Sequence, residues 1–245
     1  MKKFFMFLTA LVIAPICMAI DTLAWSPSQN LGVIAQNPII GKAKNKLGNV
    51  VFSTIFGKNI VKGKALSVHN PRTTKQTSNR IKFSVTLAFL QPIIGLIQAG
   101  FKEMAIGMSA FNAAMSYNRL NALTGIAPNI TVDLAKVVIA KGSLMGFDNL
   151  VITSPVVNAI HLAWDDNTGY GNAQAADLLR VGLYEETTDK WVSGFSAATR
   201  ADGAADIDIP AGWAGKTVHV YPFFASTTSK NASMGESAGT IVAHA

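Results

Sequence analysis

The sequence predicts an α+β protein with an N-terminal basic β-hairpin and a helical segment, followed by a C-terminal antiparallel β-sandwich of the fibronectin type III or immunoglobulin-like kind. Three observations predict this fold. Glycine-punctuated β-branched runs occupy residues 37–68, an uncharged run with helical spacing begins at Phe83, and short alternating apolar runs continue from Ile130 to the end. The composition, 49% hydrophobic and 14% charged, is that of a globular protein.

The N-terminus has the parts of a secretory signal peptide. In "MKKFFMFLTALVIAPICMA", two lysines precede an apolar run from Phe4 to Ile16, and Ala19 is an acceptable cleavage site. We therefore expect a signal peptide at 1–19 and an extracytoplasmic protein in the periplasm, on the cell surface or secreted. The alternative is that 1–32 is a mis-assigned start, with translation beginning near Val33 in a cytoplasmic protein.

Cysteine usage limits the chemistry of the mature chain. The only cysteine is Cys17, inside the apolar run that a signal peptidase would remove. The mature protein would then have no thiol, which excludes disulfides, cysteine-ligated zinc and a cysteine nucleophile.

The segment 33–127 is predicted to hold the basic hairpin and the helices. "VVFSTIF" reads as a strand, "GKN" as a turn, and "IVKGKALSV" as the returning strand, in which Ile60, Lys62 and Lys64 share one face. Charge is divided along the chain, because residues 42–102 carry eleven Lys or Arg and no acid, whereas residues 133–245 carry twelve acids and seven bases. The basic stretch predicts an anionic partner. The candidate binding residues are Lys42, Lys44, Lys46, Lys58, Lys62, Lys64, Arg72, Lys75 and Arg80.

Part of this basic stretch has a structural explanation. In "HNPRTTKQTSNR", Pro71 ends the strand region, and Thr73 with Gln76 three residues later forms a capping-box pattern. We expect a helix to begin there, which leaves the basic side chains around it for solvent, phosphate or a partner.

The run "FSVTLAFLQPIIGLIQAGF" contains nineteen residues without a charge, which is long enough to suggest a transmembrane helix. Ser84, Gln91 and Gln98 recur at sevens on one face, however, and such a polar stripe favours helices packed in a soluble protein. We expect no integral membrane span in the mature chain. The apolar stripe expected to face the core contains Phe83, Leu87, Leu90, Ile94, Ile97 and Phe101.

The segment 128–245 is predicted to form the β-sandwich. Its expected central residue is Trp164, and the absence of a cysteine pair favours a fibronectin type III-like sandwich over a disulfide-bonded immunoglobulin domain. The other expected core residues are Val181, Leu183, Val218, Val220 and Phe223.

The sequence shows no catalytic pattern. The four histidines lack metal-binding spacing, and no Gly-x-Ser-x-Gly, P-loop or dinucleotide motif occurs. "DDNTGYGN" at 165–172 offers oxygen ligands that could suit Ca²⁺, but its residues are also ordinary loop formers and its spacing is not that of an EF-hand. We expect a non-enzymatic protein with no catalytic residues, no metal and no cofactor.

Several motifs together carry a family resemblance. The stretch from "GKAKNKLGN" through "NPRTTKQTSNRIKF", with "FLQPIIGLIQAGFK", "AFNAAMSYN", "KVVIAKGSL" and "AWDDNTGYGNA", resembles a Bacteroidota family, domain of unknown function 6266. The resemblance covers about 35–245 and implies no activity and no catalytic residue. Residues 1–32 depart from it, because members begin near the hairpin.

Three functions remain open at this level. The first is a secreted or surface-exposed binding or structural protein, whose anionic partner would be a polysaccharide, lipopolysaccharide or another copy's acidic sandwich. The second is nucleic-acid binding by residues 42–82. The third is a phage-derived virion or assembly component.

Overall fold

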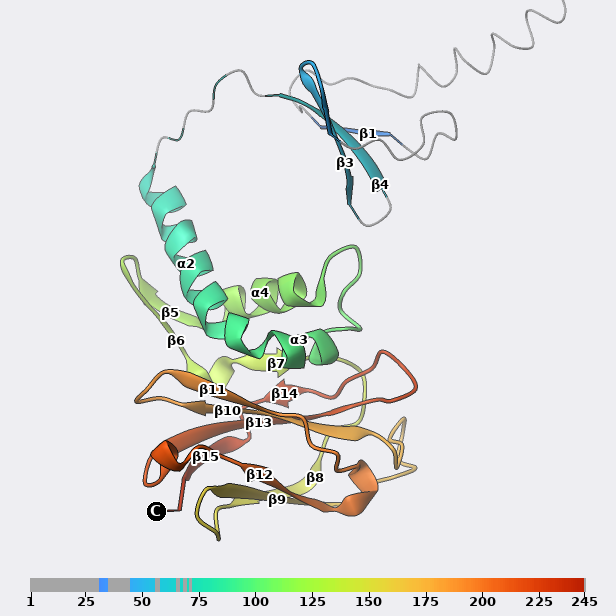
Figure 1. Cartoon of the computed structure of the whole chain (residues 1–245), viewed down its shortest axis with the longest axis vertical. Coiled ribbons are helices and arrows are strands. Elements are labelled where there is room, and N and C mark those ends of the chain that lie inside the picture. The colour runs from blue at the N-terminus through green and yellow to red at the C-terminus, as the bar shows by residue number, and fades with distance from the viewer. Residues whose placement is uncertain are drawn as a thin grey trace, which may run out of the picture. The chain divides into compact units, whose positions relative to one another are not determined.

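The chain divides into two units between Pro71 and Arg72 (Figure 1). The computed structural model describes residues 31–34, 45–55, 58–64, 67, 70 and 72–244. The expected signal peptide at 1–19 lies outside the described residues, as does all but the last part of the alternative segment 1–32.

The first unit contains a four-stranded antiparallel sheet, called the basic sheet here, with strand order β1-β4-β3-β2. The predicted hairpin is its centre, where β3 pairs with β4 from Val50 opposite Gly63 to Ile55 opposite Lys58. β1 pairs with the free edge of β4, and β2 with that of β3. The strands are β1 Leu31–Ile34, β2 Asn45–Leu47, β3 Val50–Ile55 and β4 Lys58–Gly63.

The second unit, called the helix–sandwich unit, begins with the helices. α2 starts at Thr74 with Thr73 as its N-cap, and both capping-box bonds form: the Gln76 amide donates to the Thr73 hydroxyl, and the Thr73 amide donates to the Gln76 side chain. The capping prediction is therefore confirmed. A 3₁₀ turn then separates α2 from α3. The helical elements are α2 Thr74–Leu90, η1 Gln91–Ile93, α3 Ile94–Gly100 and α4 Ala110–Asn121.

Two antiparallel sheets form the sandwich, one with strand order β11-β10-β13-β15 and the other with β12-β9-β8. This confirms the predicted α+β fold with a fibronectin type III-like β-sandwich. The strands are β8 Asp148–Thr153, β9 Ala159–Asp165, β10 Leu178–Glu185, β11 Lys190–Gly194, β12 Ala204–Asp208, β13 Thr217–Ala225 and β15 Gly239–Val242. Two short ladders lie outside these sheets, β5 Leu123–Ile126 with β6 Asn129–Val132, and β7 Val138–Ala140 with β14 Gly235–Glu236. The short 3₁₀ turns are η2 Leu134–Lys136, η3 Arg200–Asp202 and η4 Ala211–Trp213.

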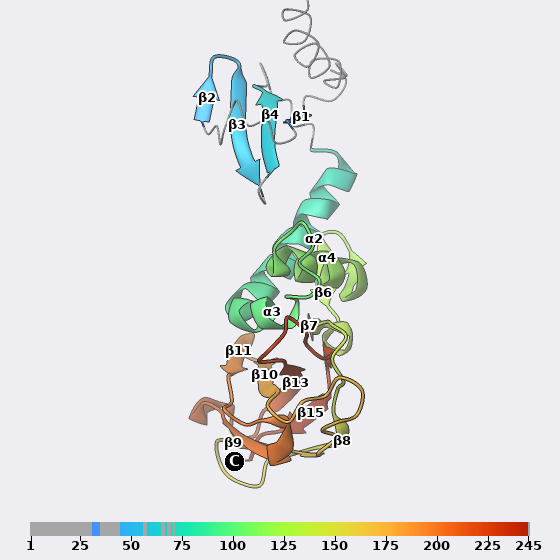
Figure 2. The ribbon, with the colours of Figure 1, turned by 90° about the vertical axis from the view of Figure 1, so that its right-hand side faces the viewer.

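The β11-β10-β13-β15 sheet, called here the four-stranded sheet of the sandwich, is covered on both faces, so the helix–sandwich unit has three layers. Along β13, Val218, Val220 and Phe224 belong to the core between the sheets, whereas Tyr221 and Phe223 belong to a second core under the helices. In both views the helices lie on one side of the β11-β10-β13-β15 sheet, and the sheet of β8, β9 and β12 lies on its other side (Figures 1 and 2). The predicted core residues are confirmed as buried, namely Trp164, Val181, Leu183, Val218, Val220 and Phe223.

Close backbone contacts hold the helices to the sandwich. A Cβ on Gly100 would lie 2.5 Å from the Cβ of Ala140, so only glycine fits where α3 ends on β7. The side chain of buried Asn118 donates to the Val138 carbonyl at 2.8 Å and accepts from the Val138 amide at 2.9 Å, which completes the pairing of β7. The helices and the sandwich are thus built as one unit.

The observed boundary differs from the predicted domains, 33–127 and 128–245. The helices share a core with the sandwich, and the boundary lies between Pro71 and Arg72. The physical reason is that the outer face of the four-stranded sheet is apolar and the helices cover it, whereas a sandwich alone would expose it.

One segment has the length and composition of a membrane span. Among the described residues, the helical stretch Thr74–Gly100 is long and apolar enough to cross a bilayer. The same stretch contributes Leu90, Ile93, Leu96 and Ile97 to the core under the helices, and all four are fully buried. Ser84, Gln91 and Gln98 are exposed, as the polar stripe predicts.

Candidate anion-binding surfaces

The first candidate surface is one face of the basic sheet. Strand alternation places Lys58, Ile60 and Lys62 of β4 on the same face, and Lys64 continues that spacing just after the strand. Lys62 pairs with Val51 of β3, and Lys58 pairs with Ile55. All three lysines are exposed. Along the strand Lys62 and Lys64 are separated by about 6.5 Å and Lys58 and Lys62 by about 13 Å, which gives the face a row of positive charge.

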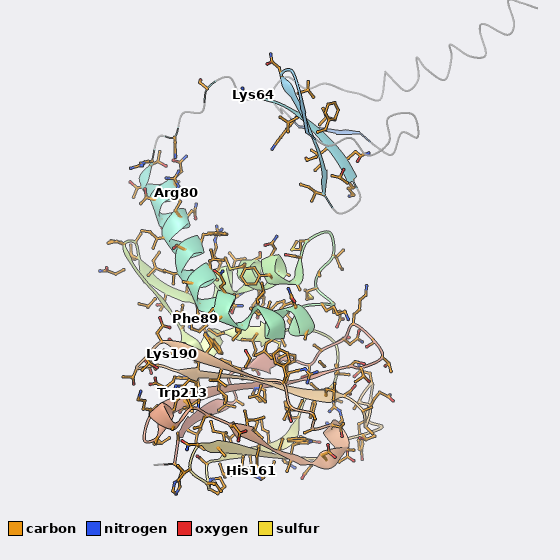
Figure 3. The ribbon with its side chains drawn as sticks, viewed as in Figure 1. Lys64, Arg80, Phe89, His161, Lys190 and Trp213 are labelled. Carbon is orange, nitrogen blue, oxygen red and sulfur yellow. The ribbon has the colours of Figure 1, made fainter. Side chains whose placement is uncertain are left out.

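The second candidate surface is the N-terminal half of α2. Arg72 has a left-handed backbone, with φ of 50°, immediately before the Thr73 cap. Lys75, Asn79 and Lys82 recur at helical spacings of four and three, so they share one helix face. Arg72, Lys75 and Arg80 are exposed, and Figure 3 shows Arg80 on the first turns of α2, away from the sandwich.

The start of α2 adds to the positive charge of its side chains. A helix N-terminus carries a partial positive charge that is normally balanced by acidic residues in the first turn. α2 has no acidic residue there, and Arg72 and Lys75 stand beside the cap. An anion from outside the unit would supply the missing negative charge.

Five cations of the two surfaces have no ion-pair partner among the described residues. Within the part of the chain that the structure describes, Lys58, Lys62, Lys64, Arg72 and Lys75 form no ion pair. The sequence explains why, since no Asp or Glu occurs between Asp21 and Glu103.

The predicted site is divided by the unit boundary. Lys58, Lys62 and Lys64 belong to the basic sheet, whereas Arg72, Lys75 and Arg80 belong to the helix–sandwich unit. Lys46 lies in β2, where it pairs with Val51. Lys42 and Lys44 lie outside the described residues, as does His69. The structure therefore describes two basic surfaces and does not join them into one.

The Asp165–Asn172 loop is built around an arginine that sequence reasoning missed. The guanidinium of Arg200, fully buried, donates to Asn167 Oδ1 at 2.6 Å, to Asp177 Oδ2 at 3.2 Å and to the carbonyls of Met145 and Gly146 at 2.8 and 3.0 Å. It also stacks over Phe224, 4.0 Å from the ring centroid. The loop's own acids are used in hydrogen bonds of the scaffold as well, since Asp165 accepts from the side-chain amide of Asn149 at 2.6 Å and Asp166 accepts from the amide and hydroxyl of Thr168. A lone arginine in "AATRADG" gives no pattern from which this role could be predicted.

A second buried charge caps the turn between β10 and β11. Buried Glu185 accepts hydrogen bonds from the Thr187 and Thr188 amides at 2.7 and 2.9 Å and from the Thr188 hydroxyl, and Lys216 lies 3.6 Å away. Burial alone would raise the pKa of Glu185, but these hydrogen bonds outweigh it and lower the pKa to about 2. Glu185 is thus a structural carboxylate that stays ionised.

The two strand histidines each contact one carboxylate. His161 Nδ1 of β9 lies 2.7 Å from Asp206, and His219 Nε2 of β13 lies 3.6 Å from Glu186. In the described ranges, no group of three or more His, Cys, Asp or Glu side chains is placed to hold a metal ion.

A family model described as "Family of unknown function (DUF6266)" matches residues 41–237, from just before the basic sheet's β2 to the end of β14. The chain belongs to the DUF6266 family. This confirms the resemblance carried by the hairpin, the cap motif and the loop sequence. The family match includes both basic surfaces and nearly all of the helix–sandwich unit, so the two units of this DUF6266 member form one family architecture.

Comparison with solved structures finds fibronectin type III domains. The fn3 domain of the human collagen alpha-1(XX) chain matches with 13% identity over 43% of this chain and 90% of that chain, with a TM-score of 0.30. The fn3 domain of human contactin 1 matches with 9% identity over 43% of this chain and 82% of that chain, with a TM-score of 0.28. No curated protein matches the chain. For this DUF6266 member the fold assignment rests on its own strand order.

Proposed function

We propose that this DUF6266 member is a non-enzymatic binding protein, exported from the cytoplasm, that binds an anionic polysaccharide or lipopolysaccharide through its basic surfaces. The observation that carries the proposal is the set of exposed lysines on β4 and α2 that form no ion pair with any residue the structure describes. The fibronectin type III-like sandwich supports a binding or structural role, since such sandwiches are common scaffolds for surface modules.

Charge repulsion among the basic side chains favours their binding to an anionic partner over a role as solvated surface residues. Residues that repel one another on one face raise the energy of the folded unit, and a polyanion relieves that repulsion as it binds. The row of lysines on β4 fits a polymer with repeated charges better than a single small anion, because each lysine can meet a different charged group. Binding of this kind weakens as salt rises.

The binding test is titration of the full chain with heparin, a soluble sulfated polysaccharide, at ~0.05 and ~0.5 M NaCl. We expect binding at the lower salt that is at least tenfold weaker at the higher salt. K62E/K64E should weaken it at least tenfold, and K75E/K82E should weaken it to a smaller extent. The control K102E/K230E removes the same charge outside the two surfaces and should leave the affinity unchanged. The absence of heparin binding at the lower salt would overturn the proposal.

The export test is the native N-terminus, read by mass spectrometry of fractionated cells. Export predicts a chain that begins at Ile20 and is recovered outside the cytoplasm. A start near Val33 in the cytoplasmic fraction would contradict export.

Nucleic acid is the second candidate partner. The acid-free stretch 42–102 favours it as much as it favours an anionic polysaccharide. Titration with single- and double-stranded DNA under the same salt conditions separates the two. If the chain binds DNA more tightly than heparin and K62E/K64E loses that binding, nucleic acid becomes the proposed partner in place of the polysaccharide.

A further inference from the structure

A groove of about 480 Å³ lies in the helix–sandwich unit, where α2 crosses the end of the four-stranded sheet. Val85, Ala88 and Phe89 of α2 form one wall, and Thr131, Val132 and Leu134 form another. Tyr184 of β10 and the turn residues Glu186 and Asp189 complete the lining. Its volume is in the range of ~300–1,000 Å³ that is usual for ligand pockets. Figure 3 labels Phe89 at the lower end of α2 and Lys190 at the start of β11, on the sheet below it.

The inner part of the groove is aromatic. The rings of Phe89 and Tyr184 lie 5.1 Å apart, and Trp191 packs 5.1 Å from each of them. Phe89 and Tyr184 are largely buried, so the positions of their rings are fixed by the core. Aromatic faces attract ammonium and guanidinium groups that approach within about 6 Å of the ring centre.

The rim of the groove is acidic and incompletely paired. Asp189 accepts a hydrogen bond from the Tyr184 hydroxyl at 2.8 Å, and the only ion-pair contact of Glu186 among the described residues is His219, at 3.6 Å. The neighbouring acids differ, since Glu185 is paired with Lys216 and Asp133 with Lys136 at 2.7 Å. Lys190 follows Asp189 in the same turn and forms no ion pair. Burial, followed by the hydrogen bond and the charge of Asp189, raises the pKa of Tyr184, so the phenol stays protonated and keeps donating to Asp189.

We propose that this groove binds a lysine side chain from the basic sheet of a second copy of the chain. Two carboxylates at the rim of an aromatic pocket suit an ammonium group on an aliphatic stem, because the stem can lie along Val85 and Ala88 while the charge meets Glu186 and Asp189. The chain itself carries the complementary surface, because Lys62 and Lys64 are exposed and form no ion pair with the residues that the structure describes.

The resulting contact is heterologous, because the basic sheet of one copy meets the groove of the next. Such contacts leave one groove and one sheet unused at the ends, so they produce chains of molecules unless they close into rings. The proposal rests on the proposed function in one respect, the availability of the β4 lysines to a partner. A polyanion and a second copy would then compete for them.

The test is sedimentation of the full chain at ~0.05 M NaCl, with two complementary variants. We expect wild type to self-associate and each of K62E/K64E and E186K/D189N to associate at least tenfold more weakly. Position 189 has φ of 52°, and asparagine tolerates this left-handed conformation best among non-glycine residues. The controls D206N/D208N and K102E/K230E should associate like wild type.

Mixing the two variants gives the decisive result. K62E/K64E keeps an intact groove and E186K/D189N keeps intact lysines, so an equimolar mixture should regain pairs that neither variant forms alone. A monomeric wild type, an unchanged groove variant or a mixture without hetero-pairs would overturn the proposal. Circular dichroism verifies that each variant is folded. If E186K/D189N is not folded, E186Q/D189N replaces it, and if K62E/K64E is not folded, K62Q/K64Q replaces it. E186K/D189N should still bind heparin, so failure here is distinct from failure of the proposed function.

Discussion

The two units of the chain differ in what their side chains do. The helix–sandwich unit buries two apolar cores and pairs its internal charges, as in the contact of Arg200 with Asp177. In the basic sheet, none of the residues of β3 and β4 is fully buried, and Lys58, Lys62 and Lys64 form no ion pair with another described residue. The difference teaches that the buried cores of the helix–sandwich unit carry the stability, whereas the basic sheet mainly offers charge to a partner. Changes to exposed lysines of the basic sheet should alter binding with little effect on stability, and changes in the buried cores should alter stability.

The largest loss of stability should come from Arg200→Met. This substitution leaves the Asp177 carboxylate buried without its cation and removes hydrogen bonds to Asn167 and to two carbonyls. Breaking a buried pair in this way costs about 3–5 kcal/mol. Urea unfolding followed by circular dichroism measures it, with exposed Lys230→Met as the control. A loss below ~1 kcal/mol would show that Arg200 does not organise the loop.

A core substitution tests whether helices and sandwich unfold together. Leu96→Ala empties a fully buried position above Gly182, at a cost of about 2–5 kcal/mol. Ile94 on the same helix is 44% exposed, so Ile94→Ala should change the free energy of unfolding by no more than ~0.5 kcal/mol. Because the helices share a core with the four-stranded sheet, both variants should unfold in one transition. A separate early helix transition would restore the predicted boundary near residue 127.

A smaller effect is expected at the helix cap. Thr73→Ala removes the hydroxyl that accepts from Gln76, which typically costs about 1 kcal/mol. Thr74→Ala, one residue into the helix, serves as the control and should cost less, since Thr74 makes no capping bond. The same urea titration measures both. Equal losses for the two variants would mean that the cap contributes little.

The effect of Glu185 should appear only in acid. Its folded pKa, about 2, lies below the ordinary value of a glutamate side chain, so its contribution to stability is complete above pH ~4.5 and is lost as the pH falls toward 2. Glu185→Gln should therefore unfold with a flatter acid dependence than wild type between these values. Stability measured against pH for the two proteins checks this. Parallel curves would show that Glu185 keeps an ordinary pKa.

The sequence predicted features that depend on local patterns. The capping box at Thr73 and Gln76 was predicted because its bonds join residues three apart, and the core residues of β10 and β13 because strands alternate. The helix stripe was partly wrong, since Phe83 is 50% exposed and Ile94 44% exposed. Within α2 the buried residues are Thr86, Phe89 and Leu90. The 3₁₀ turn η1 that follows has three residues per turn and shifts the helical phase, so that Ile93 is buried in place of Ile94.

Features that depend on contacts distant in sequence could not be predicted. Arg200 gathers partners from residues 145–177, and the acidic groove combines α2 with the β10–β11 turn. Neither arrangement leaves a pattern along the chain. The candidate lysines were identified from charge alone, and their division between two units follows from a boundary that composition does not mark.

The most direct test of the division between the units is one pair of measurements on K62E/K64E. Both side chains are exposed on the basic sheet, so we expect the unfolding of the helix–sandwich unit to stay within ~0.5 kcal/mol of wild type while heparin affinity at low salt falls at least tenfold. A large loss of stability, or an unchanged affinity in a folded protein, would contradict the account.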